Sequence, residues 1–192
     1  MKAITIGSTG AVGRDLLKVL ASDPDFERVD VLVRRLPQLP SEHAEKFHVH
    51  IIDFEHPETW KNLVTGDVLF SSLGTSKKQA GGKQPQWRVD HDYQLAAAKA
   101  ARENGVPKMV VISSLGADPA SSFFYLQMKG KIEKDLEALQ FPELTILRPP
   151  SLIRHPAKRF TETLSVARAM ARLAKREAKG TNIVIGQKIL SA

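Results

Sequence analysis

Residues 3–14 read AITIGSTGAVGR, a short apolar segment that runs into three glycines at intervals of three residues and then into a helical segment. A strand that turns at once into a helix needs a residue without a Cβ at the turn, and Gly7 meets this need. Gly10 allows the backbone to approach a diphosphate, and Gly13 allows the new helix to lie close to the strand. The stretch therefore predicts a phosphate-binding turn made of Gly7, Ser8, Thr9, Gly10, Ala11, Val12 and Gly13.

The glycine spacing is G-x-x-G-x-x-G, which differs from the G-x-G-x-x-G of ordinary dinucleotide-binding dehydrogenases. Because glycine-rich turns occur in many folds, a turn with a purely structural role is the alternative. We favour phosphate binding because the turn stands between an apolar strand and a helix. The first amides of that helix and its dipole attract negative charge.

Strand-like and helical segments alternate along the rest of the chain. Strands are expected at residues 29–33, 47–52, 67–75 with its exit loop, 108–112 and 144–147, and helices at 11–21, 90–104 and 123–139. This alternation predicts an α/β fold, a doubly wound parallel β-sheet with helices on both faces. Residues 76–86, which contain three lysines and two glycines, are expected to form a mobile loop at the mouth of the site.

The length of 192 residues suits a single domain with a full core. We divide it into a nucleotide-binding core, residues 1–150, and a shortened substrate-side segment, residues 151–192. That segment is expected to form a short α+β extension, with a helix near 161–179 and a strand at 182–185.

Composition narrows the class of protein further. The chain is 42% hydrophobic and 26% charged, as ordinary globular proteins are. No apolar run approaches the roughly 18 residues of a membrane helix, and the N-terminus does not resemble a secretory signal. The chain contains no cysteine, which excludes disulfides, thiolate catalysis and cysteine-based metal sites. These features predict a cytoplasmic protein that needs no membrane.

The net charge of +7 comes entirely from residues 154–192, which contain nine basic and two acidic residues. A basic tail can contact nucleic acid, an anionic membrane or a phosphorylated ligand. We favour a solvated helix face, because no aromatic residue after Phe160 interleaves with these charges as a single-strand-binding surface requires.

The ends of the second and third strands carry candidate cofactor contacts. Arg34 and Arg35 end the second strand, where NAD enzymes place an acid and NADP enzymes place arginines for the 2′-phosphate. Two adjacent arginines favour a bidentate clamp, and therefore NADP(H) over NAD(H), although an exposed loop is the alternative. Asp53 suits the amino group of an adenine and equally suits a turn. His48 and His50 share one strand face, but without a third ligand nearby we predict surface histidines and no metal site.

The residues with chemistry to offer come later in the chain. Tyr125 and Lys129 lie four residues apart, so a helix places the phenol and the ammonium on one face. A cation stabilises a neighbouring phenolate, which makes Tyr125 a candidate acid or base while Lys129 can also bind a ribose. Ser114, at the end of the preceding strand, can hydrogen-bond the carbonyl oxygen of a substrate. The alternative is a tyrosine that only packs while Lys129 binds the ribose.

The order of these segments over residues 3–150 resembles the atypical short-chain dehydrogenases/reductases, in the NmrA-like and Tat-interacting-protein branch. The resemblance rests on segments 7–14, 31–35, 53–54, 73–75, 89–90, 113–118, 125 with 129–130, and 147–149.

The resemblance implies strand order 3-2-1-4-5-6, NADP bound across the sheet, Tyr125 as proton donor and Lys129 on the ribose. It adds Phe54, Leu73 and Arg148 to the expected cofactor contacts, but it supplies no substrate. Gly74, in the exit loop of the fourth strand, is expected on its own account, because a glycine there lets the backbone approach the nicotinamide half of the cofactor. Similar proteins carry a longer segment after Pro149, and some of them sense the nucleotide without turnover. We therefore predict a reductase of a small carbonyl or enone, with a non-catalytic NADP(H) sensor that regulates a protein partner as the alternative.

Overall fold

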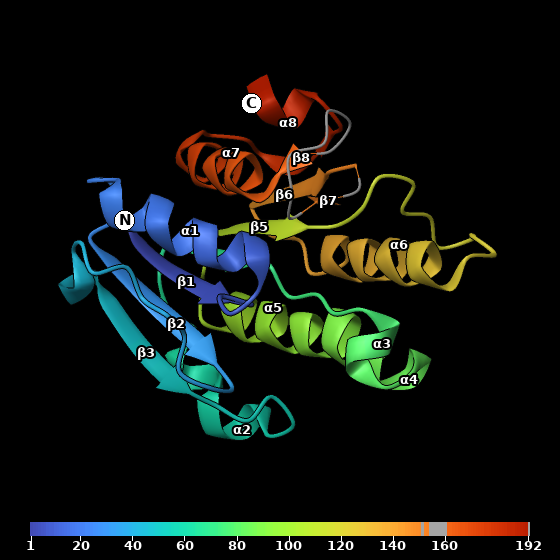
Figure 1. Ribbon diagram of the computed structural model, residues 1–192, viewed down its shortest axis with the longest axis horizontal. Helices are drawn as coiled ribbons and strands as arrows, with labels where there is room; N and C mark the ends of the chain where they lie inside the picture. The colour runs from blue at the N-terminus through green and yellow to red at the C-terminus, as the bar shows by residue number, and fades with distance from the viewer. Residues whose placement is uncertain (151, 154–160, 192) are drawn as a thin grey trace.

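The computed structural model describes residues 1–150, 152–153 and 161–191. Its centre is a seven-stranded sheet in the order β3-β2-β1-β4-β5-β6-β9, and every neighbouring pair of strands is parallel (Figure 1). The strands are β1 (Lys2–Ile6), β2 (Arg28–Val33), β3 (Phe47–Ile51), β4 (Val68–Ser71), β5 (Lys108–Ile112), β6 (Glu143–Arg148) and β9 (Gly180–Ile185). The predicted doubly wound sheet is confirmed.

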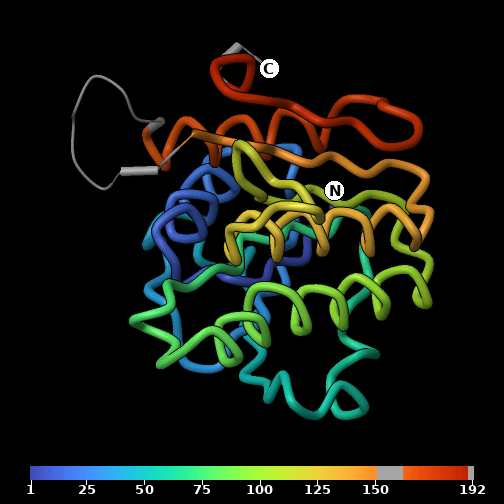
Figure 2. Tube along the Cα trace, turned by 90° about the vertical axis from the view of Figure 1, so that its right-hand side faces the viewer, coloured from blue at the N-terminus to red at the C-terminus, as the bar shows by residue number. Residues whose placement is uncertain are grey.

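Helices cover both faces of this sheet, so its central strands β1, β4 and β5 are almost continuous buried runs. The longer helices are α1 (Ala11–Ser22), α5 (Tyr93–Glu103), α6 (Phe124–Glu137) and α7 (Thr163–Lys175). Helices α1 and α7 pack side by side on one face, where Leu16 and Met170 belong to the same buried cluster (Figures 1 and 2). On the other face, Ala97 of α5 and Ile132 of α6 belong to a second cluster.

Short elements complete the chain and alter two expectations. The region expected to be a mobile loop forms α3 (Lys77–Ala80) and α4 (Lys83–Trp87), with the Ser76 hydroxyl capping α3 through the Gln79 amide at 3.2 Å. A π-helical turn, Arg88–Asp92, then leads into α5, which starts later than predicted. The remaining elements are α2 (Pro57–Trp60), the pair β7 (Leu152–Ile153) and β8 (Thr161–Glu162), α8 (Lys188–Ser191), and two short 3₁₀ turns, Ala44–Lys46 and Lys61–Leu63.

The last strand, β9, joins the main sheet as its edge strand. Strand β9 pairs with β6 in parallel, with Ile183 opposite Ile146 and Val184 opposite Leu147. The helix that precedes it, α7, crosses to the face occupied by α1. The C-terminal extension therefore adds one more strand–helix unit to the predicted sheet.

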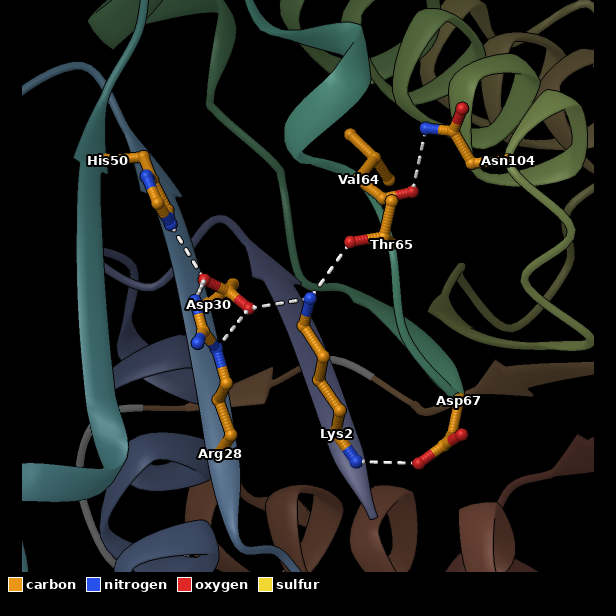
Figure 3. A network of polar contacts seen from close by, with 8 residues as sticks. All are labelled: Lys2, Arg28, Asp30, His50, Val64, Thr65, Asp67 and Asn104. Carbon is orange, nitrogen blue, oxygen red and sulfur yellow. Dashed lines mark hydrogen bonds and ion pairs between the residues drawn. The ribbon is translucent and has the colours of Figure 1, made fainter.

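A polar network fixes the three strands at the β3 edge (Figure 3). Asp30 on β2 is buried and accepts hydrogen bonds from Arg28 at 3.0 Å, while Lys2 Nζ on β1 lies 3.3 Å away. His50 Nε2 on β3 lies 2.7 Å from the same carboxylate, so this histidine has a structural partner. No three His, Asp or Glu side chains within the described part of the chain are placed to hold a metal ion.

The basic charge of the C-terminal region is partly neutralised by the loop that follows α1. Lys175 Nζ lies 2.8 Å from carboxylate oxygens of both Asp23 and Asp25, and these hydrogen bonds raise the pKa of Lys175. Arg154, Lys158 and Arg159 lie outside the described residues. None of the helices in the ranges that the structure describes is long and apolar enough to cross a membrane.

Candidate functional site

The glycine turn between β1 and α1 is built from close backbone contacts. Gly7 has a φ of +87°, and a Cβ there would lie 2.5 Å from Leu73 N at the end of β4. A Cβ on Gly13 would collide with the Gly7 carbonyl and lie 2.6 Å from Ser8 Cα. Both positions therefore need glycine, because the turn lies against β4 and α1 lies against the turn.

Helix α1 begins at Ala11, directly after this turn, with Gly10 as its N-cap. The first amides of a helix have no acceptor within the helix, and the positive end of the helix dipole lies there as well. The first turn of α1 carries no acidic side chain, and Gly10 has no side chain to cover the amides. The N-terminus of α1 is therefore suited to bind a phosphate.

A cleft of about 710 Å³ opens at this end of the sheet, between the strand ends of β1, β2 and β4. This edge is where the strand order reverses, the place at which ligands bind in open α/β sheets. Nine of the predicted cofactor residues line the cleft: Gly7, Thr9, Gly10, Ala11, Arg34, Arg35, Phe54, Leu73 and Gly74. The fold thus brings together residues that are far apart in the sequence.

Three other members of the predicted turn face inward. Ser8 is buried and its hydroxyl donates to Thr5 Oγ1 at 2.9 Å. Val12 belongs to the apolar core under α1, and Gly13 provides the close approach of the helix. These residues shape the turn and do not line the cleft.

The two residues predicted to contact the cofactor after β3, Asp53 and Phe54, have different positions. Asp53 is 64% exposed and its Oδ1 accepts the Glu55 amide at 3.0 Å, as a turn residue does. Phe54 lines the cleft and stacks on Tyr93, with 5.1 Å between the ring centroids. Asp53 itself does not line the cleft.

Glu55, Tyr93 and Arg88 were not predicted, yet they line a second, adjoining cleft of about 420 Å³ that Arg34 also lines. Glu55 Oε1 accepts the Tyr93 hydroxyl at 2.5 Å and Arg88 Nη1 at 3.2 Å. Burial and the Glu55 carboxylate raise the pKa of Tyr93 to about 12. A glutamate directly after the predicted Asp53-Phe54 pair was the only available sequence signal.

The predicted catalytic residues lie on the loop after β5 and on α6. Lys129 is buried, and its Nζ lies 5.9 Å from the centroid of the Tyr125 ring. Tyr125 is 41% exposed, so its ring is open to solvent. Ser114 donates its hydroxyl to Leu115 O at 3.3 Å. Tyr125 and Lys129 thus share one side of α6, as the four-residue spacing predicts.

Asp90 connects this helix to the cleft. Its Oδ2 lies 3.6 Å from Lys129 Nζ, and its Oδ1 accepts the amide of Thr75, a cleft residue, at 2.7 Å. Burial raises the pKa of Asp90, while the charge of Lys129 opposes that shift. In the sequence, Asp90 was one of the residues that carry the family resemblance, and no role was predicted for it.

Arg148 does not line the cleft. Its guanidinium binds Glu133 on α6, with Nε 3.0 Å from Oε1 and a second contact through Nη2. This hydrogen bonding raises the pKa of Arg148, and the pair fastens α6 to the end of β6.

The comparisons with known proteins agree with this geometry. A family model described as NAD(P)H-binding matches residues 7–177. The chain is 38% identical over 173 residues to "Protein FMP52-1, mitochondrial" of Scheffersomyces stipitis, covering 86% of this chain and 74% of that protein. It is 38% identical over 157 residues to "Protein FMP52, mitochondrial" of Saccharomyces cerevisiae, covering 80% of this chain and 66% of that protein. The chain belongs to this family of NAD(P)H-binding Rossmann domains.

Solved structures share the fold at low identity. The oxidoreductase ylbE from Lactococcus lactis superposes with a TM-score of 0.78 at 19% identity, over 96% of this chain and 90% of that chain. UDP-glucuronic acid 4-epimerase from Bacillus cereus, solved with NAD, superposes with a TM-score of 0.74 at 16% identity, over 96% of this chain and 78% of that chain. At these identities the likeness concerns the fold alone.

One prediction is wrong. The chain was expected to be cytoplasmic, but relatives at 35–41% identity over most of its length are named as mitochondrial proteins. The prediction rested on two properties of the chain, its lack of cysteine and its lack of a long apolar run. Neither property distinguishes the cytoplasm from another reducing compartment.

Proposed function

We propose that this protein is an NADPH-dependent oxidoreductase that reduces a small carbonyl or enone compound. The observation that carries the proposal is the connection through Asp90, which links the Lys129 ammonium beside Tyr125 to the Thr75 amide in the dinucleotide cleft. The resemblance to the NmrA-like branch of the atypical short-chain dehydrogenases/reductases supports the same reaction class.

The chain offers a site for each part of the dinucleotide. The N-terminus of α1 and the turn at Gly7 and Gly10 would hold the diphosphate. Arg34 and Arg35, both exposed at the end of β2, would hold the 2′-phosphate, which favours NADP(H) over NAD(H). Lys129 would bind the ribose next to the nicotinamide, the group that supplies a hydride when the cofactor is bound.

The remaining chemistry belongs to side chains of this chain. Tyr125 would donate its phenolic proton to the substrate oxygen as that oxygen gains negative charge. The Lys129 ammonium would stabilise the phenolate that remains, and Ser114 would hydrogen-bond the same oxygen. Solvent returns the proton to Tyr125, whose ring is partly exposed.

Tyr125→Phe tests this proposal. The variant keeps the ring but lacks the proton, so NADPH oxidation in a screen of small aldehydes, ketones and enones should fall at least about 100-fold. NADPH affinity, measured by calorimetry, should stay within about twofold of wild type, because Tyr125 is not expected to hold the cofactor. Turnover equal to wild type in the variant would refute the role of Tyr125.

A non-catalytic NADP(H) sensor is the second candidate, and one observation favours it. Leu115 and Phe123, which neighbour Ser114 and Tyr125 in the sequence, are 48% and 72% exposed. Exposed apolar side chains near the predicted catalytic residues suit a protein partner as well as a substrate. NADPH binding without turnover of any carbonyl, together with a partner that distinguishes free from NADPH-loaded protein, would support the sensor over the reductase.

A further inference from the structure

The pair formed by Asp90 and Lys129 is almost completely buried. The side chains are 1% and 4% exposed, and the closest oxygen and nitrogen lie 3.6 Å apart. Removing two charges from water costs several kcal/mol, and a pair at this separation lacks the short hydrogen bond that offsets such a cost. Stability alone therefore does not explain the pair.

The two oxygens of Asp90 have different surroundings. Oδ1 accepts the Thr75 amide at 2.7 Å, and Gln86 Nε2 donates to Thr75 O at 2.9 Å. The backbone of Asp90 is fixed as well, because Gln94 Nε2 donates to Asp90 O at 2.5 Å. This network holds the Gly74–Thr75 turn, which lines the dinucleotide cleft, against α4 and the π-helical turn that leads into α5.

Oδ2, in contrast, has no hydrogen-bond partner among the described residues. It faces Gly74, where a Cβ would lie 3.8 Å from Oδ2 and meet no other atom within 4 Å. The hydroxyl of Ser113, at the end of the neighbouring strand β5, is likewise buried and unpartnered among those residues. Buried polar atoms are nearly always hydrogen-bonded. Neither Asp90 nor Lys129 lines the clefts, but Oδ2 lies behind Gly74 of the cleft wall, so a ligand hydroxyl that enters beside Gly74 would give this oxygen a partner.

We propose that Asp90 is a ligand-binding and positioning residue, whose Oδ2 together with Lys129 Nζ binds the vicinal hydroxyls of the ribose on the nicotinamide side. The carboxylate accepts a hydrogen bond from one hydroxyl and the ammonium donates to the oxygen of its neighbour, so the pair matches a diol better than either group alone. Through Oδ1, the same side chain sets the Gly74–Thr75 turn. This inference rests on the proposed binding of NADPH and adds a residue that the reaction scheme does not use.

Asp90→Asn tests the proposal, with calorimetric titration of NADPH and of adenosine 2′,5′-bisphosphate, which lacks the nicotinamide ribose. Asparagine keeps an oxygen for the Thr75 amide but lacks the charge. NADPH affinity should fall about tenfold, which corresponds to one charge-assisted hydrogen bond, while the bisphosphate binds as to wild type. Asp92→Asn is the matched control, because Asp92 contacts His91 and Trp87, whereas Asp90 contacts Lys129 and Thr75.

A second variant guards against misfolding of Asp90→Asn. Gly74→Ala introduces a methyl group at an ordinary contact distance from Oδ2, so the fold should persist while access to the carboxylate is reduced. Like Asp90→Asn, it should lower the affinity for NADPH and leave the affinity for the bisphosphate unchanged. An equal loss for both ligands, or no loss for either, would overturn the role of Asp90. If wild type bound neither ligand, the proposed cofactor itself would fail, which is a different result.

Discussion

His50 Nε2 on β3 lies 2.7 Å from Asp30 Oδ1 on the neighbouring strand β2 (Figure 3). The same carboxylate also binds Arg28 and faces Lys2. Burial opposes ionisation of Asp30, but the hydrogen bonds from Arg28 and His50 and the charge of Lys2 lower its pKa to about 2. Two cations, one histidine and one buried carboxylate therefore bind three strands together at the β3 edge.

This network predicts acid sensitivity. The unfolded chain protonates Asp30 near pH 4 and the folded chain only near pH 2. The stabilisation from Asp30 is therefore present above pH 4 and is lost as the pH falls from 4 to 2, by about 2 kcal/mol. Urea unfolding of wild type and Asp30→Asn between pH 7 and pH 2 should show curves that converge over this interval. Asp53→Asn, at an exposed turn, should show the same dependence of unfolding free energy on pH as wild type. If the pH curves of Asp30→Asn and wild type ran parallel, the prediction would be contradicted.

Glu133→Gln should destabilise the protein. Glu133 is a buried residue of α6, and its carboxylate is the partner of Arg148. The substitution leaves a half-buried guanidinium without its counter-ion, which costs about 2–4 kcal/mol in the free energy of unfolding. Urea denaturation measures this loss. Glu137→Gln, exposed one turn further along α6, should change stability by less than about 0.5 kcal/mol. Similar values for the two variants would show that the pair does not hold α6.

Gly13→Ala should weaken both folding and cofactor binding. The added methyl group collides with the Gly7 carbonyl, so α1 must move away from the turn. We expect a loss of about 1–3 kcal/mol in stability and a large loss of NADPH affinity, because the helix amides shift. Gly10→Ala is the comparison: its Cβ meets Gly7 O at 3.2 Å, a milder contact. A smaller thermal shift for Gly13→Ala than for Gly10→Ala would contradict this account.

The double variant Arg34→Ala/Arg35→Ala tests cofactor preference. If the arginines bind the 2′-phosphate, NADPH affinity should fall at least about tenfold while NADH affinity changes little. Fluorescence titration with both nucleotides measures the ratio of the affinities. Lys99→Ala, which removes an exposed positive charge from α5, controls for a general electrostatic effect. Equal losses of affinity for NADPH and NADH would mean that the arginines contact a part of the cofactor that both nucleotides share.

The amino-acid sequence by itself determined the local geometry and the order of elements. Gly13 signals a close approach of α1 to the turn that precedes it, and that contact is present. The alternation of apolar and helical segments predicts a parallel sheet because each strand must be followed by a covering helix. The end of each strand was therefore predictable, and with it the cleft that Arg34 and Gly74 line.

Only the tertiary structure decided which side chains meet. Three contacts join residues of different elements. Arg148 binds Glu133, Glu55 accepts a hydrogen bond from Tyr93, and Asp90 pairs with Lys129. Periodicity and motif spacing specify which face of an element is buried. They do not specify the rotation and offset of one packed element against the next, to which a hydrogen bond of about 3 Å is sensitive. Partner choice at the site therefore depends on how α5 and α6 pack together on the sheet.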